Sequence, residues 1–171
     1  SDSLSRVKPS ATIAVTDKAR ALRAEGRDVI GLGAGEPDFD TPEHIKEAGF
    51  EAIRSGQTKY TAVSGIDELK QAICDKFKKD QGIDYSADEI VVSCGAKHSV
   101  YNVMLALLNP GDEVIIPAPY WVSYPQQANL LSAKSVIIPT TFESQYKITA
   151  DQLEAAITPK SKLLILNSPS N

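Results

Sequence analysis

The feature that most constrains the fold is an alternation of short apolar runs and helix-patterned stretches along most of the chain. The runs are rich in Val, Ile and Leu, whereas the stretches between them carry apolar residues three and four positions apart. Strands separated by helices favour a parallel sheet. The sequence therefore predicts an α/β fold, a mostly parallel sheet flanked by helices. The expected strands are residues 89–94, 113–117, 135–139 and 163–167, with helices after Gly95, at about 121–131 and at about 150–157.

Capping patterns mark the expected helix starts. Thr41 followed by Pro42 resembles an N-cap with proline at the first helical position, which predicts a helix from 42 to about 55. Ser64 to Asp67 resembles a capping box before a second helix, and Thr149 with Gln152 forms the same pattern later in the chain. The first 30 or so residues precede the alternation, so we expect them to form an arm or part of another domain.

Composition excludes several classes of function. The 171 residues are 42% hydrophobic and 23% charged, which is ordinary for one globular domain, and the net charge is -4. Without a run of Lys and Arg, nucleic acid is not an expected partner. Since no apolar run approaches the roughly 20 residues that span a bilayer, and no signal peptide is evident, we expect a cytoplasmic protein without membrane contact. Cys74 and Cys94, with His44 and His98, lack metal-ligand spacing, so no metal is expected and the cysteines are expected to be buried, reduced thiols.

Three expected strand ends carry residues suited to a flat phosphorylated ligand. Gly95, Ala96 and Lys97 open a helix after the first strand, and a helix N-terminus offers unpaired N–H groups to a phosphate. Trp121 follows the next strand and could stack on a ring, and Asn171 follows the last strand with a side-chain amide. Each residue also has a structural interpretation: a solvated lysine, an aromatic core residue and a simple turn. The carboxyl ends of parallel strands are nevertheless where ligands collect.

Taken in order, the motifs of the chain resemble those of the class I, fold-type I aminotransferases that use pyridoxal phosphate. The resemblance is greatest to the bacterial aspartate aminotransferases of the aspartate/prephenate subgroup, and it covers essentially the whole chain. It implies the large domain of the aspartate aminotransferase-like fold. The motifs are VKPSAT (7–12), GAGEPDFDTP (33–42), TKYT (58–61), GAK (95–97), NPGDEV (109–114), PYWVSYP (119–125) and NSPSN (167–171).

The resemblance implies a set of cofactor contacts. The turn formed by Gly95, Ala96 and Lys97 would hold the phosphate of pyridoxal phosphate, and Trp121 would stack on its ring. Asn171 would bond its phenolic oxygen. Tyr60 would reach the phosphate in a neighbouring subunit, which makes a homodimer with shared active sites the expected assembly. The chain departs from close relatives at Ala96, where a second glycine is frequent, and at His98, where glutamine is common.

The resemblance also implies how amino acid and 2-oxo acid substrates would bind. Gly35 would let the backbone approach the substrate α-carboxylate, and Trp121 and Asn171 would contribute to the same site. Lys8 matches a position linked in this subgroup to accepting prephenate beside aspartate. An exposed charge without a binding role is the other interpretation of Lys8.

The expected activity is transfer of the amino group of L-aspartate to 2-oxoglutarate by the whole protein. No catalytic residue is expected in this chain, because the family's Schiff-base lysine lies beyond the motif that ends at Asn171, as do the partner of the pyridinium nitrogen and the arginine for the α-carboxylate. We therefore expect an inactive N-terminal part of a longer polypeptide. Residues 1–30 would form the arm and part of the small domain, and 31–171 half of the large domain. The alternatives are an alanine or aromatic aminotransferase, a carbon–sulfur lyase, or a noncatalytic binding protein.

Overall fold

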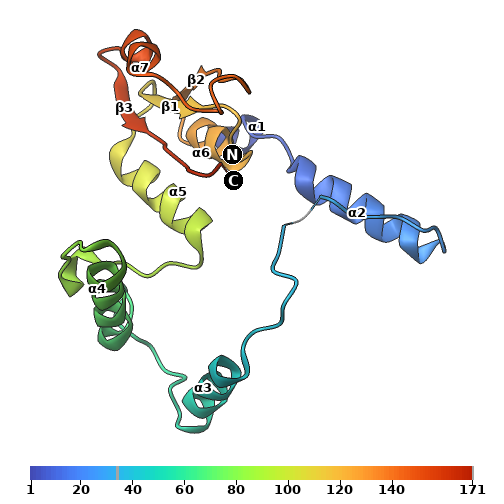
Figure 1. Ribbon diagram of the computed structural model, residues 1–171, viewed down its shortest axis with the longest axis vertical. Coiled ribbons are helices and arrows are strands. Elements are labelled where there is room, and N and C mark those ends of the chain that lie inside the picture. The colour runs from blue at the N-terminus through green and yellow to red at the C-terminus, as the bar shows by residue number, and fades with distance from the viewer. Residues whose placement is uncertain (34, 171) are drawn as a thin grey trace. The chain divides into compact units, whose positions relative to one another are not determined.

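The computed structural model describes residues 1–33 and 35–170, which divide into two units (Figure 1). One unit comprises residues 1–30 together with 95–171, and the other comprises 31–94. All the described strands belong to the first unit.

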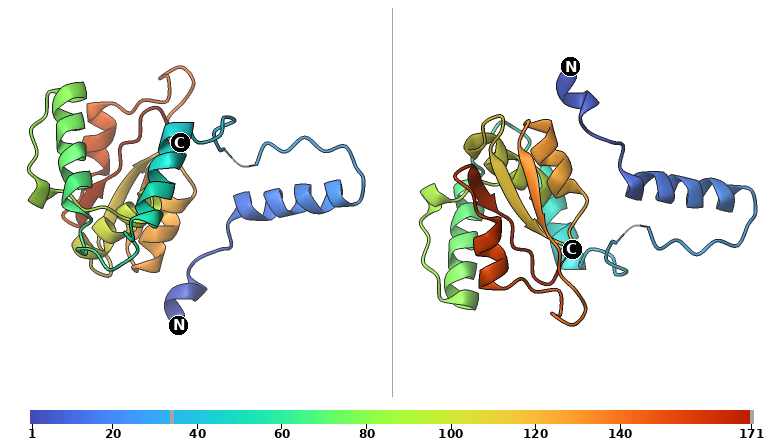
Figure 2. Two further views of the ribbon diagram at one scale, coloured as in Figure 1. Left: turned by 90° about the horizontal axis from the view of Figure 1, so that it is seen from below. Right: turned by 90° about the horizontal axis from the view of Figure 1, so that it is seen from above.

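A three-stranded parallel sheet forms the centre of the first unit. Its order is β2 (Lys134–Ile138), β1 (Glu113–Pro117), β3 (Ser161–Leu164), so the first strand in sequence is the middle one. Ile115 of β1 is in register with Val136 on one side and Leu164 on the other, and both pairings are parallel. Figure 2 shows the strands with helices beside them. The predicted α/β fold with a parallel sheet is confirmed.

Helices supply the connections between the strands, because parallel strands need a crossover connection rather than a tight turn. α5 (Ala96–Leu107) leads into β1, α6 (Ser123–Leu130) connects β1 to β2, and α7 (Ala150–Ala156) connects β2 to β3. α5 and α6 pack on the face of β1 that carries Val114 and Ile116. The main core cluster is Met104, Leu108, Val114, Ile116, Tyr124, Ala128 and Ala133.

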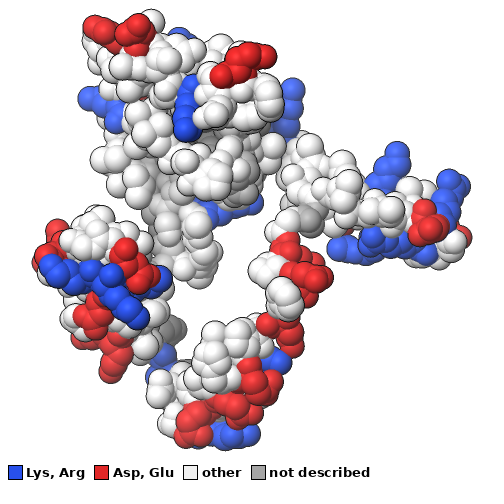
Figure 3. Space-filling model, viewed as in Figure 1, with Lys and Arg blue, Asp and Glu red and all other residues white. Residues whose placement is uncertain are grey.

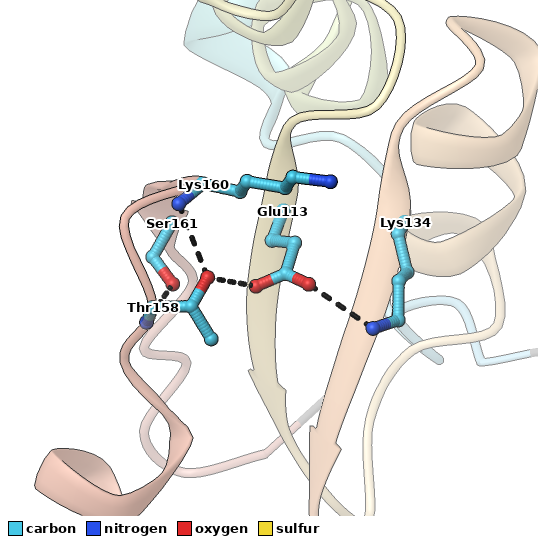
Figure 4. Close-up of polar contacts among 5 residues, drawn as sticks. All are labelled: Glu113, Lys134, Thr158, Lys160 and Ser161. Atoms are coloured by element: carbon cyan, nitrogen blue, oxygen red, sulfur yellow. Dashed lines mark hydrogen bonds and ion pairs between the residues drawn. The ribbon is translucent and has the colours of Figure 1, made fainter.

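Polar contacts join the strands at the edge where they begin (Figure 4). Glu113, at the start of β1, accepts a 2.6 Å hydrogen bond from Thr158 Oγ1 and a 3.0 Å hydrogen bond from Lys134 Nζ at the start of β2. These bonds, Thr158 first, hold the pKa of the Glu113 carboxyl below its ordinary value, although burial opposes the shift. Through Glu113, these bonds connect the starts of β1 and β2 to the turn that precedes β3.

The N-terminal segment contains two helices that the sequence patterns did not predict. They are α1 (Asp2–Ser5) and α2 (Ala11–Ala24), and α1 packs against α6. The side chain of Ser10 caps α2 by accepting a 3.4 Å hydrogen bond from the backbone N–H of Ile13.

The second unit contains α3 (Glu43–Arg54), α4 (Asp67–Gln81) and the short 3₁₀ helix η1 (Ala87–Glu89). Acidic and basic side chains lie together on α3 and α4 in the view of Figure 3. Lys76 of α4 pairs with Asp80 of the same helix, and Lys78 pairs with Asp84 just beyond it. The unit therefore presents mixed charge on that view.

Two of the three predicted helix caps were wrong, whereas the third is confirmed. The N-cap of α3 is Pro42 rather than Thr41, and that of α4 is Ile66 rather than Ser64. The cause at α4 is Gly65, whose φ of 110° turns the chain after Ser64 and keeps that residue outside the helix. Thr149 and Gln152 form a complete capping box at α7.

The predicted strand at 89–94 was also wrong. Residue 89 ends η1, and 90–94 are not part of a strand. A strand needs neighbours for its backbone N–H and C=O groups. Here the N–H of Val92 donates instead to the carbonyl oxygen of Ser64, at 2.8 Å. The remaining strands and helices lie within a few residues of their predicted bounds.

The described residues include neither a membrane-spanning helix nor a group of metal-ligating side chains. No helix among them is both long and apolar enough to cross a membrane. In the same part of the chain, His, Cys, Asp and Glu side chains do not gather in a group of three that could hold a metal ion.

Candidate functional site

The loops that follow the three strands meet at the carboxyl edge of the sheet. Ser170 Oγ, after β3, donates a 2.8 Å hydrogen bond to the carbonyl oxygen of Pro119, after β1. Thr140 Oγ1, after β2, donates to the carbonyl oxygen of Ala118. A cavity of about 740 Å³ lies among these loops, lined by residues that include Tyr120 and Asn167. Asn171, the predicted amide donor, lies outside the described residues.

The N-terminus of α5 lies beside the loop that follows β1. Gly95 is the N-cap of α5 with φ 85° and ψ 164°, a conformation that favours glycine. The first N–H groups of a helix have no partner within the helix, so those of Ala96 and Lys97 face outward at this end. The Lys97 ammonium lies over the Trp121 ring, 4.9 Å from its centroid. The structure thus brings together the turn 95–97 and Trp121, although the strand at 89–94 on which that expectation rested is not among the described strands.

Gln127 of α6 fixes the first turn of α5. Its Nε2 donates a 2.8 Å hydrogen bond to the carbonyl oxygen of Lys97, and the side chain is only 9% exposed. Its Oε1 is buried without a hydrogen-bond partner. A buried oxygen without a hydrogen-bond partner costs free energy, so Oε1 of Gln127 can accept a hydrogen bond near the N-terminus of α5. No local pattern in the sequence indicates this role for Gln127.

A second cavity, of about 440 Å³, is lined by both Lys8 and Lys97. The N-terminal segment 7–11 contributes the wall with Lys8, and α6 contributes Ser123, Gln126 and Gln127. The two lysines are 89 positions apart in sequence (97 − 8). Two cations around one cavity favour an anionic ligand there.

Arg6 is a second residue that sequence patterns did not identify. Its Nε donates a 3.0 Å hydrogen bond to the carbonyl oxygen of Asn129, and a terminal nitrogen donates a 3.1 Å bond to that of Leu130. Next along the chain, the N–H of Lys8 donates to Oε1 of Gln126 at 3.2 Å. These contacts attach the start of the chain to α6.

Two predicted site residues, Gly35 and Tyr60, belong to the other unit. Tyr60 is fully exposed, and a Cβ added at Gly35 would have no atom within 4 Å. Packing within the described residues therefore does not account for glycine at position 35.

Asp40 and Thr41, farther along the same motif, have a structural role at the start of α3. The Asp40 carboxylate accepts hydrogen bonds of 2.8 Å from Lys46 Nζ and from the Thr41 N–H. These two bonds, Lys46 first, lower the pKa of Asp40.

The residues at the N-terminus of α5 fit a flat phosphorylated ligand such as pyridoxal phosphate. The helix N-terminus and the lysine suit a phosphate, and the indole of Trp121 offers a face for a ring. A Cβ at Gly95 would meet no atom within 4 Å, so the cap stands beside open space.

Comparisons with known proteins agree with one another. Residues 27–171 match the family model described as aminotransferase class I and II. The chain is 60% identical over 171 residues to an aspartate/prephenate aminotransferase of Cereibacter sphaeroides, covering 100% of this chain and 43% of the relative. It is 53% identical over 163 residues to an aspartate aminotransferase of Geobacillus stearothermophilus, covering 95% of this chain and 42% of the relative. The chain thus spans less than half the length of these relatives.

Solved structures resemble the chain over its whole length. An aspartate aminotransferase of Rhizobium meliloti has a TM-score of 0.94 and 49% identity, covering 100% of this chain and 43% of the other. An aspartate aminotransferase of Thermus thermophilus, solved with maleate, has a TM-score of 0.97 and 44% identity, covering 100% of this chain and 45% of the other.

Proposed function

The chain belongs to the class I and II aminotransferases, and from that premise we propose that it serves in a pyridoxal-phosphate enzyme transferring the amino group of L-aspartate to 2-oxoglutarate. The observation that carries the proposal is the position of Lys97 over Trp121 at the N-terminus of α5. Relatives named for aspartate and for aspartate/prephenate support this substrate class.

We propose that this end of α5 holds the cofactor. The N–H groups of Ala96 and Lys97 would bond the phosphate, with the cap geometry of Gly95 exposing them and the Lys97 ammonium adding a full charge. Trp121 would support the ring, and Asn171 would bond its phenolic oxygen. When bound, pyridoxal phosphate supplies an electron sink for charge at the substrate α-carbon. Gln127 would keep the first turn of α5 in place through its bond to Lys97.

The cavity between Lys8 and Lys97 is the proposed site for an anionic group of the substrate. Two lysines there would favour dicarboxylates over amino acids with an uncharged side chain. Gly35 would let the backbone approach the substrate α-carboxylate, and Trp121 and Asn171 would contribute to the same substrate-binding site. The maleate in the Thermus thermophilus structure, itself a dicarboxylate, agrees with this substrate class.

The assembly proposed is a cytoplasmic homodimer in which Tyr60 reaches the phosphate of the other subunit. Its complete exposure in the chain is compatible with such a role. Residues 1–30 would contribute the arm and part of the small domain, and 31–171 half of the large domain. The lysine that bonds the cofactor covalently, and the arginine for the α-carboxylate, are expected in the additional length of the relatives. The 171 residues alone are therefore expected to be inactive.

The test is substrate profiling of the whole protein. Oxaloacetate formation from L-aspartate and 2-oxoglutarate is compared with transamination of alanine, tyrosine and prephenate. Lys97→Met is expected to weaken cofactor binding about tenfold through loss of a charge-assisted contact. Lys18→Met, an exposed change on α2, is the matched control. A preference for alanine or tyrosine over aspartate would refute the proposed substrate, and absence of bound cofactor would refute the enzyme class.

A further inference from the structure

The structure shows Lys8 on the wall of a cavity but gives its backbone only one hydrogen bond among the described contacts, from its N–H to Gln126. The segment 7–11 around it lies between α1 and α2, outside any helix or strand until α2 begins at Ala11. A further contact between this N-terminal segment and α6 is therefore needed to keep Lys8 in place.

Arg6 provides that attachment. The carbonyl groups in the last turn of a helix lack partners within the helix, and a cation near them is favourable. The Arg6 guanidinium bonds two carbonyls at this end of α6, those of Asn129 and Leu130, at 3.0 and 3.1 Å, and the Asn129 carbonyl also accepts the N–H of Ser132 at 3.0 Å. The planar fork of donors on arginine can bridge two acceptors at once, which a lysine ammonium does less well.

The same guanidinium also organises α1. Arg6 donates to the carbonyl oxygen of Asp2 at 3.3 Å and to Ser3 Oγ at 3.1 Å. One side chain thus joins α1, the segment that carries Lys8 and the C-terminal end of α6. α6 thus bonds the backbone of both lysines that line the cavity, Lys8 through Gln126 and Lys97 through Gln127.

From these contacts we infer that Arg6 is a positioning residue, which holds Lys8 in the cavity shared with Lys97 and so sets the affinity for the anionic side chain of the substrate. The inference rests on the proposed function for the identity of that substrate. Arg6 itself does not line the cavity. Its effect on binding is therefore indirect, through the placement of residues 7–11.

The test compares Arg6→Ala and Arg6→Lys with Arg20→Ala in the whole protein. Arg20 is exposed on α2 and pairs with Asp17 of the same helix, so its removal takes away a positive charge of the N-terminal segment without removing a bond to α6. Arg6→Ala is expected to raise the KM for L-aspartate about tenfold, as loss of charge-assisted hydrogen bonds would. The KM for alanine and the affinity for pyridoxal phosphate should stay unchanged. Arg6→Lys should give an intermediate KM, and Arg20→Ala the wild-type value.

A second measurement does not depend on activity. Amide hydrogen exchange at Lys8 should accelerate in Arg6→Ala and not in Arg20→Ala, because the bond from Lys8 N–H to Gln126 opens more often once the segment is loosened. Unchanged exchange at Lys8 would overturn the inference, and so would an equal rise of KM for aspartate and alanine. If Arg6→Ala does not fold, Arg6→Lys decides both measurements.

Failure of the proposed function would be recognised separately. If the wild-type protein does not transaminate aspartate, the affinity for maleate replaces KM as the measure of anion binding at this cavity. Weaker maleate binding in Arg6→Ala, with faster exchange at Lys8, would then still support the positioning role. Unchanged maleate affinity would overturn it.

Discussion

Replacing Gly65 by alanine should destabilise the chain through two separable effects. Gly65 has a φ of 110°, in the region that side chains with a Cβ rarely adopt. A Cβ built there would lie 2.7 Å from Val92 Cγ2 and 2.9 Å from Val92 Cβ. Backbone strain of this kind costs roughly 1–3 kcal/mol, and overpacking costs roughly 1–3 kcal/mol more. We expect Gly65→Ala to lower the free energy of unfolding by roughly 2–6 kcal/mol.

Val92 cannot move away freely, because its N–H is bonded to the carbonyl oxygen of Ser64, next to the glycine itself. The clash is therefore expected to displace the turn that precedes α4 rather than to be absorbed by a flexible side chain. This is why both energetic contributions should be measurable together.

Two other glycines separate the contributions. Gly56 has a φ of 78° with no atom within 4 Å of an added Cβ, so Gly56→Ala should show the backbone cost alone, about 1–2 kcal/mol. Gly49 lies inside α3 with similarly open space, so Gly49→Ala should stabilise by about 0.5–1 kcal/mol.

The assay is urea unfolding followed by far-ultraviolet circular dichroism, repeated in a Val92→Ala background. Removing the Val92 methyl groups relieves the 2.7 Å contact and leaves the 2.9 Å contact with Cβ, so Gly65→Ala should lose part of its steric cost in that background. If Gly65→Ala costs no more than Gly56→Ala, or costs the same in both backgrounds, the steric part of the reasoning is refuted.

Three further predictions concern the sheet and the proposed cofactor site. The hydrogen bonds in Figure 4 lower the pKa of Glu113. Its carboxylate therefore stabilises the fold at pH values above the ordinary glutamate pKa of about 4.3. This stabilisation is lost as the pH falls through the lowered pKa of the folded state. Urea midpoints should therefore show Glu113→Gln less stable than wild type at pH 7, with the difference shrinking toward pH 3. Pyridoxal phosphate should quench the fluorescence of Trp121, the only tryptophan of the chain. Lys97→Met should raise the dissociation constant for pyridoxal phosphate about tenfold. A quenching curve that Lys97→Met leaves unchanged would contradict the proposed site. Met104→Ala should lower the free energy of unfolding by roughly 2–5 kcal/mol, because Met104 is fully buried. Val103→Ala, on the exposed side of α5, should lower it by less than about 1 kcal/mol. Equal losses in thermal or urea unfolding would refute the assignment of the core.

Patterns within a few residues of one another were enough for much of the fold. The β-branched run at Glu113–Pro117 and the apolar stripe of α5 predicted a strand and a helix that the structure contains, and Thr149 with Gln152 predicted a real capping box. These features depend on side chains that are neighbours along the chain, and the physical preferences of such neighbours can be recognised in the sequence.

The motifs of the candidate site were equally visible, since Lys97 and Trp121 each follow a recognisable local pattern. The Lys97 ammonium lies 4.9 Å from the centroid of the Trp121 ring, which was expected only in outline and from a strand at 89–94 that is not among the described strands. Their proposed roles, like those of Lys8, Gly35, Tyr60 and Asn171, remain predictions.

Local patterns and motifs in the sequence were thus enough to predict the order of most helices and strands and the family to which the chain belongs. The absence of a strand at residues 90–94 became clear from the folded chain, in which Val92 bonds to Ser64 instead of to a neighbouring strand. The tertiary structure alone placed Arg6 against the end of α6, 123 residues away from Asn129. A hydrogen bond between distant residues depends on how the intervening chain folds, so no local pattern specifies either contact.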